Sequence, residues 1–306
     1  MKAILKQTGS CESYDGTRLY YEVRGEGFPI VMCYGIGCLM NHWTHQIKHF
    51  SRSYKVITFD YRAHHKSDMP QDRSKLSIDS LAQDVEALMT HLNIEQASLW
   101  GHSFGAQVAI RFFDMFPQRV HSLVFINGFA TNPIDGMFGN DLPNSVFHLI
   151  KTGYSTLPET ISYLWRVSLN NPLAIHLSAL AGGFNLHLTS LKDIEIYARG
   201  ISSMDLDAFL RLFEHMMKYD GDSVLERINV PCLVIGGAKD SVTPRKFQEA
   251  LHRKIKGSQF LMVPYGSHCT QLDMPELVNL KIDHFLSGIL KTNRPLDDHP
   301  KADRSV

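Results

Sequence analysis

Short apolar runs recur along the chain, and segments with helical periodicity separate them. Within each run the apolar character is continuous rather than alternating, which is typical of parallel strands in a sheet that is covered on both faces. The segments between the runs provide the helical crossovers that parallel strands need. The pattern predicts an α/β fold with buried strands at Pro29–Tyr34, Lys55–Asp60, Ala97–Gly101, Val120–Asn127, Cys232–Gly236 and Gln259–Pro264.

The clearest helix lies between the second and third predicted strands. Ser77 or Asp79 can cap it, and its apolar positions are three or four residues apart, at Leu81, Val85, Leu88, Met89 and Leu92. Further helices are expected over Ala106–Phe113 and over Asp273–Leu286. Pro244 fits the first turn of a helix that follows the fifth predicted strand.

The alternation of strands and helices stops between Ala130 and Glu226. Four prolines punctuate this block, and helical patterns of apolar residues follow them. We therefore expect an all-helical insertion at 130–226 within a core made of 1–129 and 227–290. The polar segment 291–306 is expected to be a frayed tail outside the fold.

Composition excludes several classes of protein. The 306 residues balance 31 basic against 31 acidic side chains, so nothing favours binding to nucleic acid or to an anionic membrane. The first residues contain no apolar targeting segment and no run reaches 18 apolar residues, which leads us to expect a cytoplasmic protein. Five scattered cysteines are expected to be reduced thiols.

The chain is rich in histidine, with 16 residues. His42, His45 and His49 fall at helical spacing, where two imidazoles could share a metal ion. Because no carboxylate or thiol lies among them, we interpret them as a solvated helix face and expect no metal site.

The segment Gly101-His102-Ser103-Phe104-Gly105 ends the third predicted strand and opens a helix. This is the context of a nucleophile elbow, in which a serine is held in strained backbone geometry with its hydroxyl exposed. Glycines two positions before and after the serine are needed, because side chains there would collide with the strand or the helix. We therefore predict that Ser103 is a nucleophile, and we regard His102 as an ordinary residue of the motif.

A serine hydroxyl is a weak nucleophile at neutral pH. Ser103 therefore needs a histidine to take its proton and a carboxylate to orient that histidine. His268 follows the last predicted strand, and Asp240 follows the strand that begins at Cys232. Since parallel strands end at one edge of their sheet, where such folds place their sites, we expect Ser103, Asp240 and His268 to meet there.

These motifs resemble the α/β-hydrolase superfamily over about Asp15 to Leu286. Gly236-x-x-x-Asp240-x-x-x-Pro244 is similar to the acid loop of that family, and His268 with Asp273-x-Pro275-Glu276 is similar to its histidine loop and last helix. The family's other position for the acid, after the sixth strand, holds Asn127. The resemblance implies a mostly parallel, eight-stranded sheet with helices on both faces, and a helical cap at 130–226.

Three stretches depart from the family pattern. Tyr34-Gly35-Ile36-Gly37 stands where the family has His-Gly, but this loop contributes a backbone N–H, so the N–H groups of Ile36 and Phe104 remain the expected oxyanion donors. Asp60–Ser67 is similar to the family's D-x-R-G-x-G-x-S turn, with Ala63 and His65 in place of glycines; we interpret His64 and His65 as structural. Ala106 after the elbow is a mild variation.

The resemblance implies a serine hydrolase that forms an acyl-enzyme on Ser103 and needs no metal or organic cofactor. A small or medium carboxylic ester is the expected substrate. Cleavage of a carbon–carbon bond in a dienoic diketone is one alternative, and a ligand receptor that keeps the triad with little turnover is another. The oligomeric state is left open.

Apolar residues of the insertion are expected to line the pocket over Ser103, and no exposed apolar pattern suited to a lipid interface is expected. The residues expected in this lining are Phe138, Phe147, Leu149, Tyr154, Tyr163, Trp165, Phe184, Phe209, Phe213 and Met216.

Overall fold

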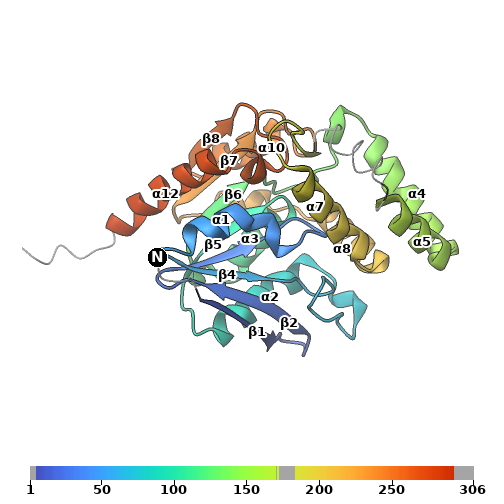
Figure 1. The fold of residues 1–306 in the computed structure, drawn as a ribbon, viewed down its shortest axis with the longest axis horizontal. Coiled ribbons are helices and arrows are strands. Elements are labelled where there is room, and N and C mark those ends of the chain that lie inside the picture. Colours follow the sequence, from blue (N-terminus) through green and yellow to red (C-terminus); the bar gives the residue numbers. More distant parts are fainter. Residues whose placement is uncertain (1–4, 170, 172–182, 293–306) are drawn as a thin grey trace, which may run out of the picture.

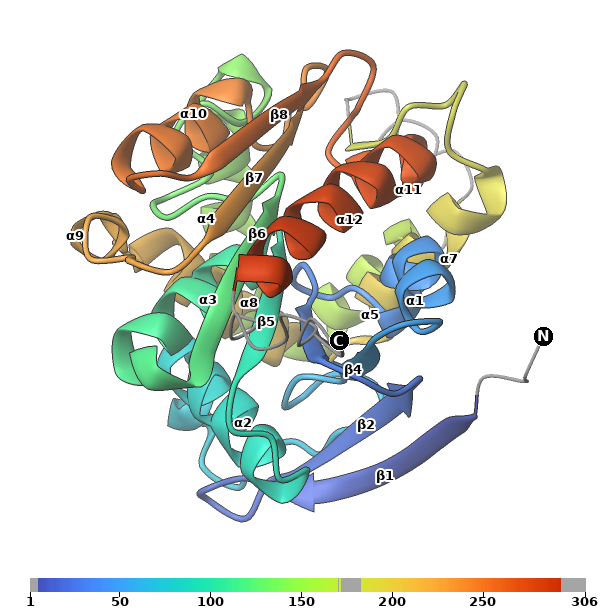
Figure 2. The ribbon, with the colours of Figure 1, turned by 90° about the vertical axis from the view of Figure 1, so that its left-hand side faces the viewer.

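A computed structural model describes residues 5–169, 171 and 183–292. One eight-stranded sheet, in the order β1-β2-β4-β3-β5-β6-β7-β8, runs through the molecule (Figures 1 and 2). The pairs from β4 to β8 are parallel, whereas β2 is antiparallel to both β1 and β4. The strands are β1 (Lys6–Glu12), β2 (Arg18–Arg24), β3 (Pro29–Cys33), β4 (Lys55–Phe59), β5 (Ala97–His102), β6 (Val120–Ile126), β7 (Cys232–Gly237) and β8 (Gln259–Val263).

The six predicted strands are confirmed as β3 to β8, each with ends within one residue of the prediction. β1 and β2 had no predicted counterpart. β1 lies at the edge of the sheet and exposes most of its side chains, so it carries no apolar run. The eight-stranded, mostly parallel sheet that the family resemblance implied is nevertheless present.

Helices cover the sheet, and Figure 2 shows α12 running across one of its faces. Ser77 caps α2, because its hydroxyl accepts a hydrogen bond of 3.2 Å from the N–H of Ser80. The helices of the core are α1 (Thr44–Phe50), α2 (Ile78–His91), α3 (Phe104–Met115), α10 (Arg245–Lys254), α11 (Thr270–Asp273) and α12 (Pro275–Thr292), with short 3₁₀ helices η1 (Met40–Trp43), η2 (Arg73–Lys75) and η3 (Pro117–Arg119).

The last helix differs from its prediction at both ends. It begins at Pro275 rather than Asp273, because α11 ends before a proline that fits the first turn of a new helix. It extends to Thr292, so the expected tail begins two residues later than predicted. The rest of that tail, 293–306, lies outside the described residues.

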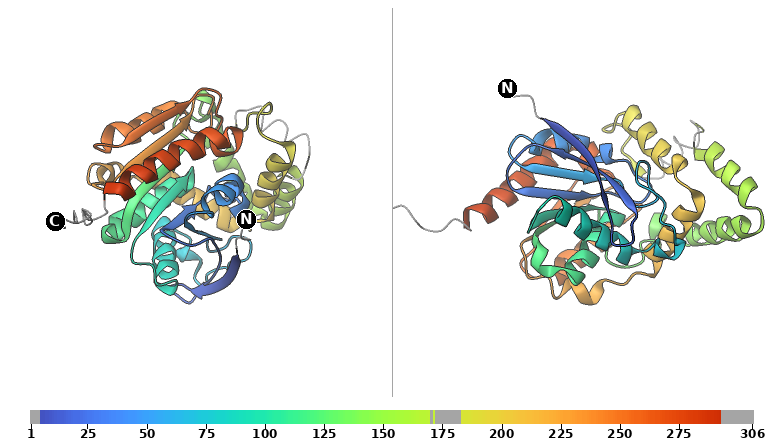
Figure 3. Two further views of the ribbon diagram at one scale, coloured as in Figure 1. Left: turned by 60° about the vertical axis from the view of Figure 1, so that its left-hand side comes forward. Right: turned by 90° about the horizontal axis from the view of Figure 1, so that it is seen from below.

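Between β6 and β7 the described residues form helices and turns without a strand, as the prediction for this block required. Figures 1 and 3 show that α4 and α5 lie farthest from the sheet, while α7 and α8 lie between them and the strands. The elements of this insertion are η4 (Met137–Gly139), α4 (Leu142–Thr156), α5 (Pro158–Leu169), α7 (Leu191–Ser203), α8 (Leu206–Lys218) and α9 (Asp222–Leu225).

The insertion has a small apolar core of its own. Phe147, Leu206 and Leu210 are buried together, and Tyr154, Trp165, Phe209 and Phe213 pack against them. Three other residues were expected to line the pocket but face solvent instead. Leu149, Tyr163 and Phe138 are 73%, 61% and 41% exposed. That part of the prediction is wrong.

The outer helices of the insertion also expose apolar side chains that the prediction did not foresee. These are Leu142, Val146, Leu149, Leu157, Tyr163, Leu164 and Val167 on and beside α4 and α5. Helical periodicity places some of them opposite the face that packs on the insertion's core. None of the helices within the described ranges combines the length and apolar character that crossing a bilayer requires.

The interpretation of the three spaced histidines as a solvated helix face is wrong for His42. This side chain is 4% exposed on η1, whereas His45 and His49 on α1 are partly exposed. The helical spacing could not show this, because η1 turns the chain before α1 begins. All five cysteines are buried free thiols.

Candidate active site

Ser103 lies between the end of β5 and the start of α3, with φ 54° and ψ −123°. Such a backbone conformation is costly for a residue with a side chain, and it is maintained here by tight packing around the elbow. A Cβ on Gly101 would lie 2.6 Å from the Cα of Ala106, and one on Gly105 would lie 2.2 Å from the carbonyl oxygen of Cys33. The two glycines of the motif are therefore required by close approach of backbone to backbone, as predicted.

Replacing Gly105 by alanine should destabilise the fold by about 3 kcal/mol or more, the upper end of what overpacking costs, because β3 and α3 must separate to admit the methyl group. Urea unfolding measures the change. Gly288→Ala in α12 is the matched control, since a Cβ there meets no atom within 4 Å and alanine favours a helix by about 1 kcal/mol. Equal stability of the two variants would contradict the role given to Gly105.

The structure brings the three predicted side chains together in one hydrogen-bonded chain. His268 Nε2 lies 2.9 Å from Ser103 Oγ, and His268 Nδ1 lies 3.0 Å from Asp240 Oδ2. Ser103 follows β5, Asp240 follows β7 and His268 follows β8, so the carboxyl ends of three parallel strands supply the group. Asp240 and His268 are buried while Ser103 remains partly accessible.

The Asp240 carboxylate is surrounded by donors. Oδ1 accepts hydrogen bonds from the N–H groups of Val242 (2.9 Å) and Thr243 (2.8 Å). Oδ2 accepts from the Thr243 hydroxyl and the Asn127 amide, both at 2.7 Å. These bonds hold the carboxylate in place and aim Oδ2 at the imidazole. From the sequence, Asn127 was interpreted only as the residue that fills the family's other position for the acid. Its role as a hydrogen-bond donor to Asp240 was not predicted.

The expected oxyanion donors belong to two segments that adjoin Ser103. The Phe104 N–H belongs to the first turn of α3, where N–H groups have no partner within the helix. The loop that carries Ile36 also lies close to Ser103, because a Cβ on Gly35 would lie 3.3 Å from Ser103 Cβ. Gly37, with φ 72°, completes a turn in which the Cys38 N–H donates to the Gly35 carbonyl at 3.0 Å.

The sequence matches the alpha/beta hydrolase fold family over residues 29–275, which is most of the chain. The chain belongs to this family. Among curated relatives, epoxide hydrolase 4 of Mus musculus is 23% identical over 291 residues, covering 89% of this chain and 77% of that protein.

Two solved structures share the fold. A bromoperoxidase from Bacillus anthracis superposes with a TM-score of 0.75 at 20% identity, covering 92% of this chain and all of that one. An esterase from Thermogutta terrifontis gives a TM-score of 0.72 at 21% identity, covering 92% and 99% of the two chains.

The departures of this α/β hydrolase from the family pattern now have physical explanations. Ala63 and His65 adopt φ 59° and 45°, so the turn keeps the left-handed conformation that glycines would take. Each left-handed residue costs about 1 kcal/mol, and a buried ion pair supports the turn against that cost. Arg62, fully buried, donates to both carboxylate oxygens of Asp84 at 2.6 and 2.7 Å.

The histidines of this turn hold the loop 34–38, which carries the expected oxyanion donor Ile36 and is called the oxyanion loop below. His64 Nδ1–H donates to the Arg62 carbonyl at 3.0 Å, so Nε2 accepts the Gly37 N–H at 3.1 Å. Burial lowers the pKa of His64 to about 3, which keeps it neutral and able to accept. His65 Nε2 donates to the Cys38 carbonyl at 2.8 Å. The structural interpretation of both histidines is confirmed, and their partner is the loop that carries Ile36.

Tyr34 replaces the family's histidine, and its side chain is fully buried. Its buried hydroxyl lies 3.3 Å from Asp60 Oδ1 and accepts the Tyr61 N–H at 3.0 Å. The Tyr61 hydroxyl in turn donates to the Tyr34 carbonyl at 3.0 Å. Tyr34 thus joins its own loop to Asp60 and Tyr61 through these hydrogen bonds.

Two further residues that the sequence analysis did not assign support His268. Asp273 accepts hydrogen bonds from the N–H (2.6 Å) and hydroxyl (2.7 Å) of Ser267, the residue before His268. His102 donates from Nε2 to the His268 carbonyl at 2.9 Å. Burial lowers the pKa of His102 well below its usual range, so this imidazole is neutral. The position of His102 in the elbow was the only signal for it in the sequence.

Proposed function

We propose that this α/β hydrolase cleaves a small or medium carboxylic ester through an acyl-enzyme on Ser103. The observation that carries the proposal is the continuous hydrogen-bonded chain from Ser103 Oγ through His268 to Asp240. A serine, a histidine and a buried carboxylate in this order can generate a nucleophile at neutral pH. The hydrolase and esterase names among the relatives and structural neighbours agree with it.

In the proposed first step, Ser103 Oγ attacks the ester carbonyl carbon while His268 Nε2 takes the hydroxyl proton. Asp240 holds the imidazole with its proton on Nδ1 and stabilises the imidazolium that forms. The four hydrogen bonds from Asn127, Val242 and Thr243 hold the Asp240 carboxylate in position against the imidazole during this step. His268 then passes its proton to the alcohol, which leaves as the tetrahedral intermediate collapses to the acyl-enzyme.

The N–H groups of Ile36 and Phe104 stabilise the oxygen that becomes negative during this attack. Each such donor typically lowers the barrier by about 3 to 4 kcal/mol. His64 and His65 act indirectly, because they fix the loop on which Ile36 lies. In the second step, His268 removes a proton from water, which attacks the acyl carbonyl and releases the acid and Ser103.

Serine at the elbow makes epoxide opening, the activity in the name of one relative, a poor match for this chain. A serine oxygen that opened an epoxide would become an ether. An ether has no carbonyl carbon for water to attack, so the enzyme would stay alkylated. An ester of serine has such a carbon, and the donors described above stabilise its hydrolysis.

A panel of nitrophenyl esters, from acetyl to palmitoyl, tests the proposal against both alternatives. We expect turnover of the short and medium esters. Burial of each added methylene contributes about 0.8 kcal/mol of binding free energy, so catalytic efficiency should rise with chain length until the site is full. Loss of absorbance from a dienoic diketone, without ester turnover, would replace the ester proposal by carbon–carbon cleavage. Binding of ligands with no turnover of either kind would instead indicate the receptor.

A further inference from the structure

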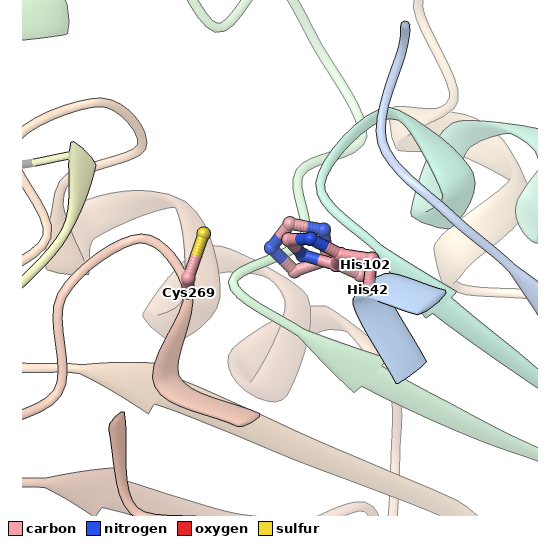
Figure 4. Close-up of side chains that lie close together, drawn as sticks. All are labelled: His42, His102 and Cys269. Atoms are coloured by element: carbon pink, nitrogen blue, oxygen red, sulfur yellow. The ribbon is translucent and has the colours of Figure 1, made fainter. Parts of the chain in front are cut away.

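A compact group of two histidines and a cysteine, residue types that can bind metals, includes the residues next to Ser103 and His268 in the chain. One ligand atom each from His42, His102 and Cys269 lies within 4.8 Å of the other two, and all three residues are at most 4% exposed. They come from η1, from the end of β5 and from the residue after His268. In the view of Figure 4 the two imidazole rings overlap each other, and the Cys269 side chain lies to one side of them.

His102 keeps one ring nitrogen with a free lone pair. Because Nε2 donates to the His268 carbonyl, Nδ1 carries no proton. Within the described residues this buried Nδ1 has no hydrogen-bond partner, although buried polar atoms are usually paired.

A second thiol and a missing side chain adjoin the cluster. Cys38 Sγ and His102 Nδ1 lie 3.2 and 3.4 Å from the point that a Cβ on Gly35 would occupy. Ser103 Cβ lies 3.3 Å from the same point, so this thiol, the His102 imidazole and the nucleophile pack closely around Gly35. His42 also lines a small pocket of about 10 Å³ with Asn41 and Leu272, among other residues.

We propose that His42, His102 and Cys269 form a binding site for a thiophilic closed-shell cation such as Zn²⁺, and that occupation of this site switches the enzyme off. Two imidazoles and a thiolate suit Zn²⁺ and its chemical relatives, and exclude hard cations such as Mg²⁺ and Ca²⁺. On binding, the Cys269 thiol loses its proton to solvent and a sulfur–metal bond forms.

The link to activity follows from geometry and rests on the proposed function. Metal–nitrogen and metal–sulfur bonds are about 2.0 to 2.3 Å long, so ligand atoms up to 4.8 Å apart must move closer by roughly 1 Å. His102 precedes Ser103 and Cys269 follows His268, so this movement displaces both ends of the 2.9 Å contact between the nucleophile and its base. A misplacement of about 1 Å can lower a rate by about 100-fold.

Cd²⁺ titration of the reduced full-length protein tests the site without any use of activity. We expect one equivalent to produce the ultraviolet charge-transfer absorption of a cadmium–thiolate bond, with release of at least one proton. Cys269→Ser should weaken Cd²⁺ binding by roughly 100-fold, and His42→Phe, which keeps a ring for stacking on His102, should also weaken it. Cys11→Ser, at a buried thiol on β1, is the matched control and should bind as the native chain does.

Absence of the absorption in the native chain, or the same affinity in Cys269→Ser, would overturn the site. Zn²⁺ inhibition of ester hydrolysis then tests the switch. The native chain and Cys11→Ser should lose about 100-fold in kcat with one equivalent of Zn²⁺, and Cys269→Ser should retain most of its own rate. Equal inhibition of Cys269→Ser would show that the ion acts on Ser103 or His268 directly and would overturn the switch, while the cadmium result would stand apart from it.

Discussion

Ser103→Ala should lower kcat for ester hydrolysis by a factor on the order of 10⁶, with little change in the temperature of unfolding. The serine oxygen is the atom that bonds to the substrate, so the remaining groups can only hold the ester near water. The folded state loses one hydrogen bond, to His268, from a residue that is only partly buried. Ser103 keeps a strained backbone conformation with or without its hydroxyl, so the variant should fold normally.

Kinetics and chemical labelling together measure this effect. An organophosphate ester should add its mass to the peptide that contains Ser103 in the native chain and to no peptide of Ser103→Ala. The double variant Ser103→Ala with His268→Ala should be no slower than either single one, because residues that act as a unit have losses that do not add. Retained hydrolysis in a clean preparation of Ser103→Ala would refute the nucleophile assignment.

Asp240→Asn should lower kcat by roughly 10⁴. The amide oxygen can accept the N–H groups of Val242 and Thr243, which leaves the new NH₂ group facing the Asn127 NH₂ and His268 Nδ1. Two donors then oppose each other, and an imidazole that must accept at Nδ1 carries its proton on Nε2. In that tautomer His268 cannot take the proton of Ser103.

A comparison with Asn127→Ala distinguishes this cause from general damage to the site. Asn127→Ala removes one of the four hydrogen bonds that Val242, Thr243 and Asn127 donate to the Asp240 carboxylate. Its loss of rate should therefore be far smaller than that of Asp240→Asn. Both variants should unfold cooperatively. A large loss in Asn127→Ala with a small one in Asp240→Asn would mean that the support for His268 comes from the end of β6.

Sequence patterns predicted the parallel part of the sheet because continuous apolar runs follow directly from burial on both faces. They missed β1, whose side chains mostly face solvent and whose pairing with β2 is a long-range hydrogen-bond ladder without an apolar signal. They located the insertion as helical. They did not show which of its aromatic residues turn outward, because the face a helix buries depends on its neighbours.

The three groups of the hydrogen-bonded chain could be predicted because local geometry restricts their surroundings. Gly101 is required by its contacts with the backbone of Gly105 and Ala106, and Gly105 by its contact with the backbone of Cys33 at the end of β3. Asn127 and Thr243 could not be identified as partners of Asp240, since amides and hydroxyls have many uses and their contacts are set by tertiary structure. His42 was misjudged for the same reason: its burial depends on η1, on β5 and on the loop after β8.

The contact between α7 and the oxyanion loop limits how this protein can be re-engineered. A Cβ on Gly200 would lie 2.7 Å from the Gly37 carbonyl oxygen, so the helix rests on the backbone of the turn that carries Ile36. Exchange of the whole insertion between family members is a natural way to transplant substrate preference. In this chain the insertion is not an independent module, and a donor segment must bring a glycine to the position of Gly200 or it will displace the Ile36 N–H.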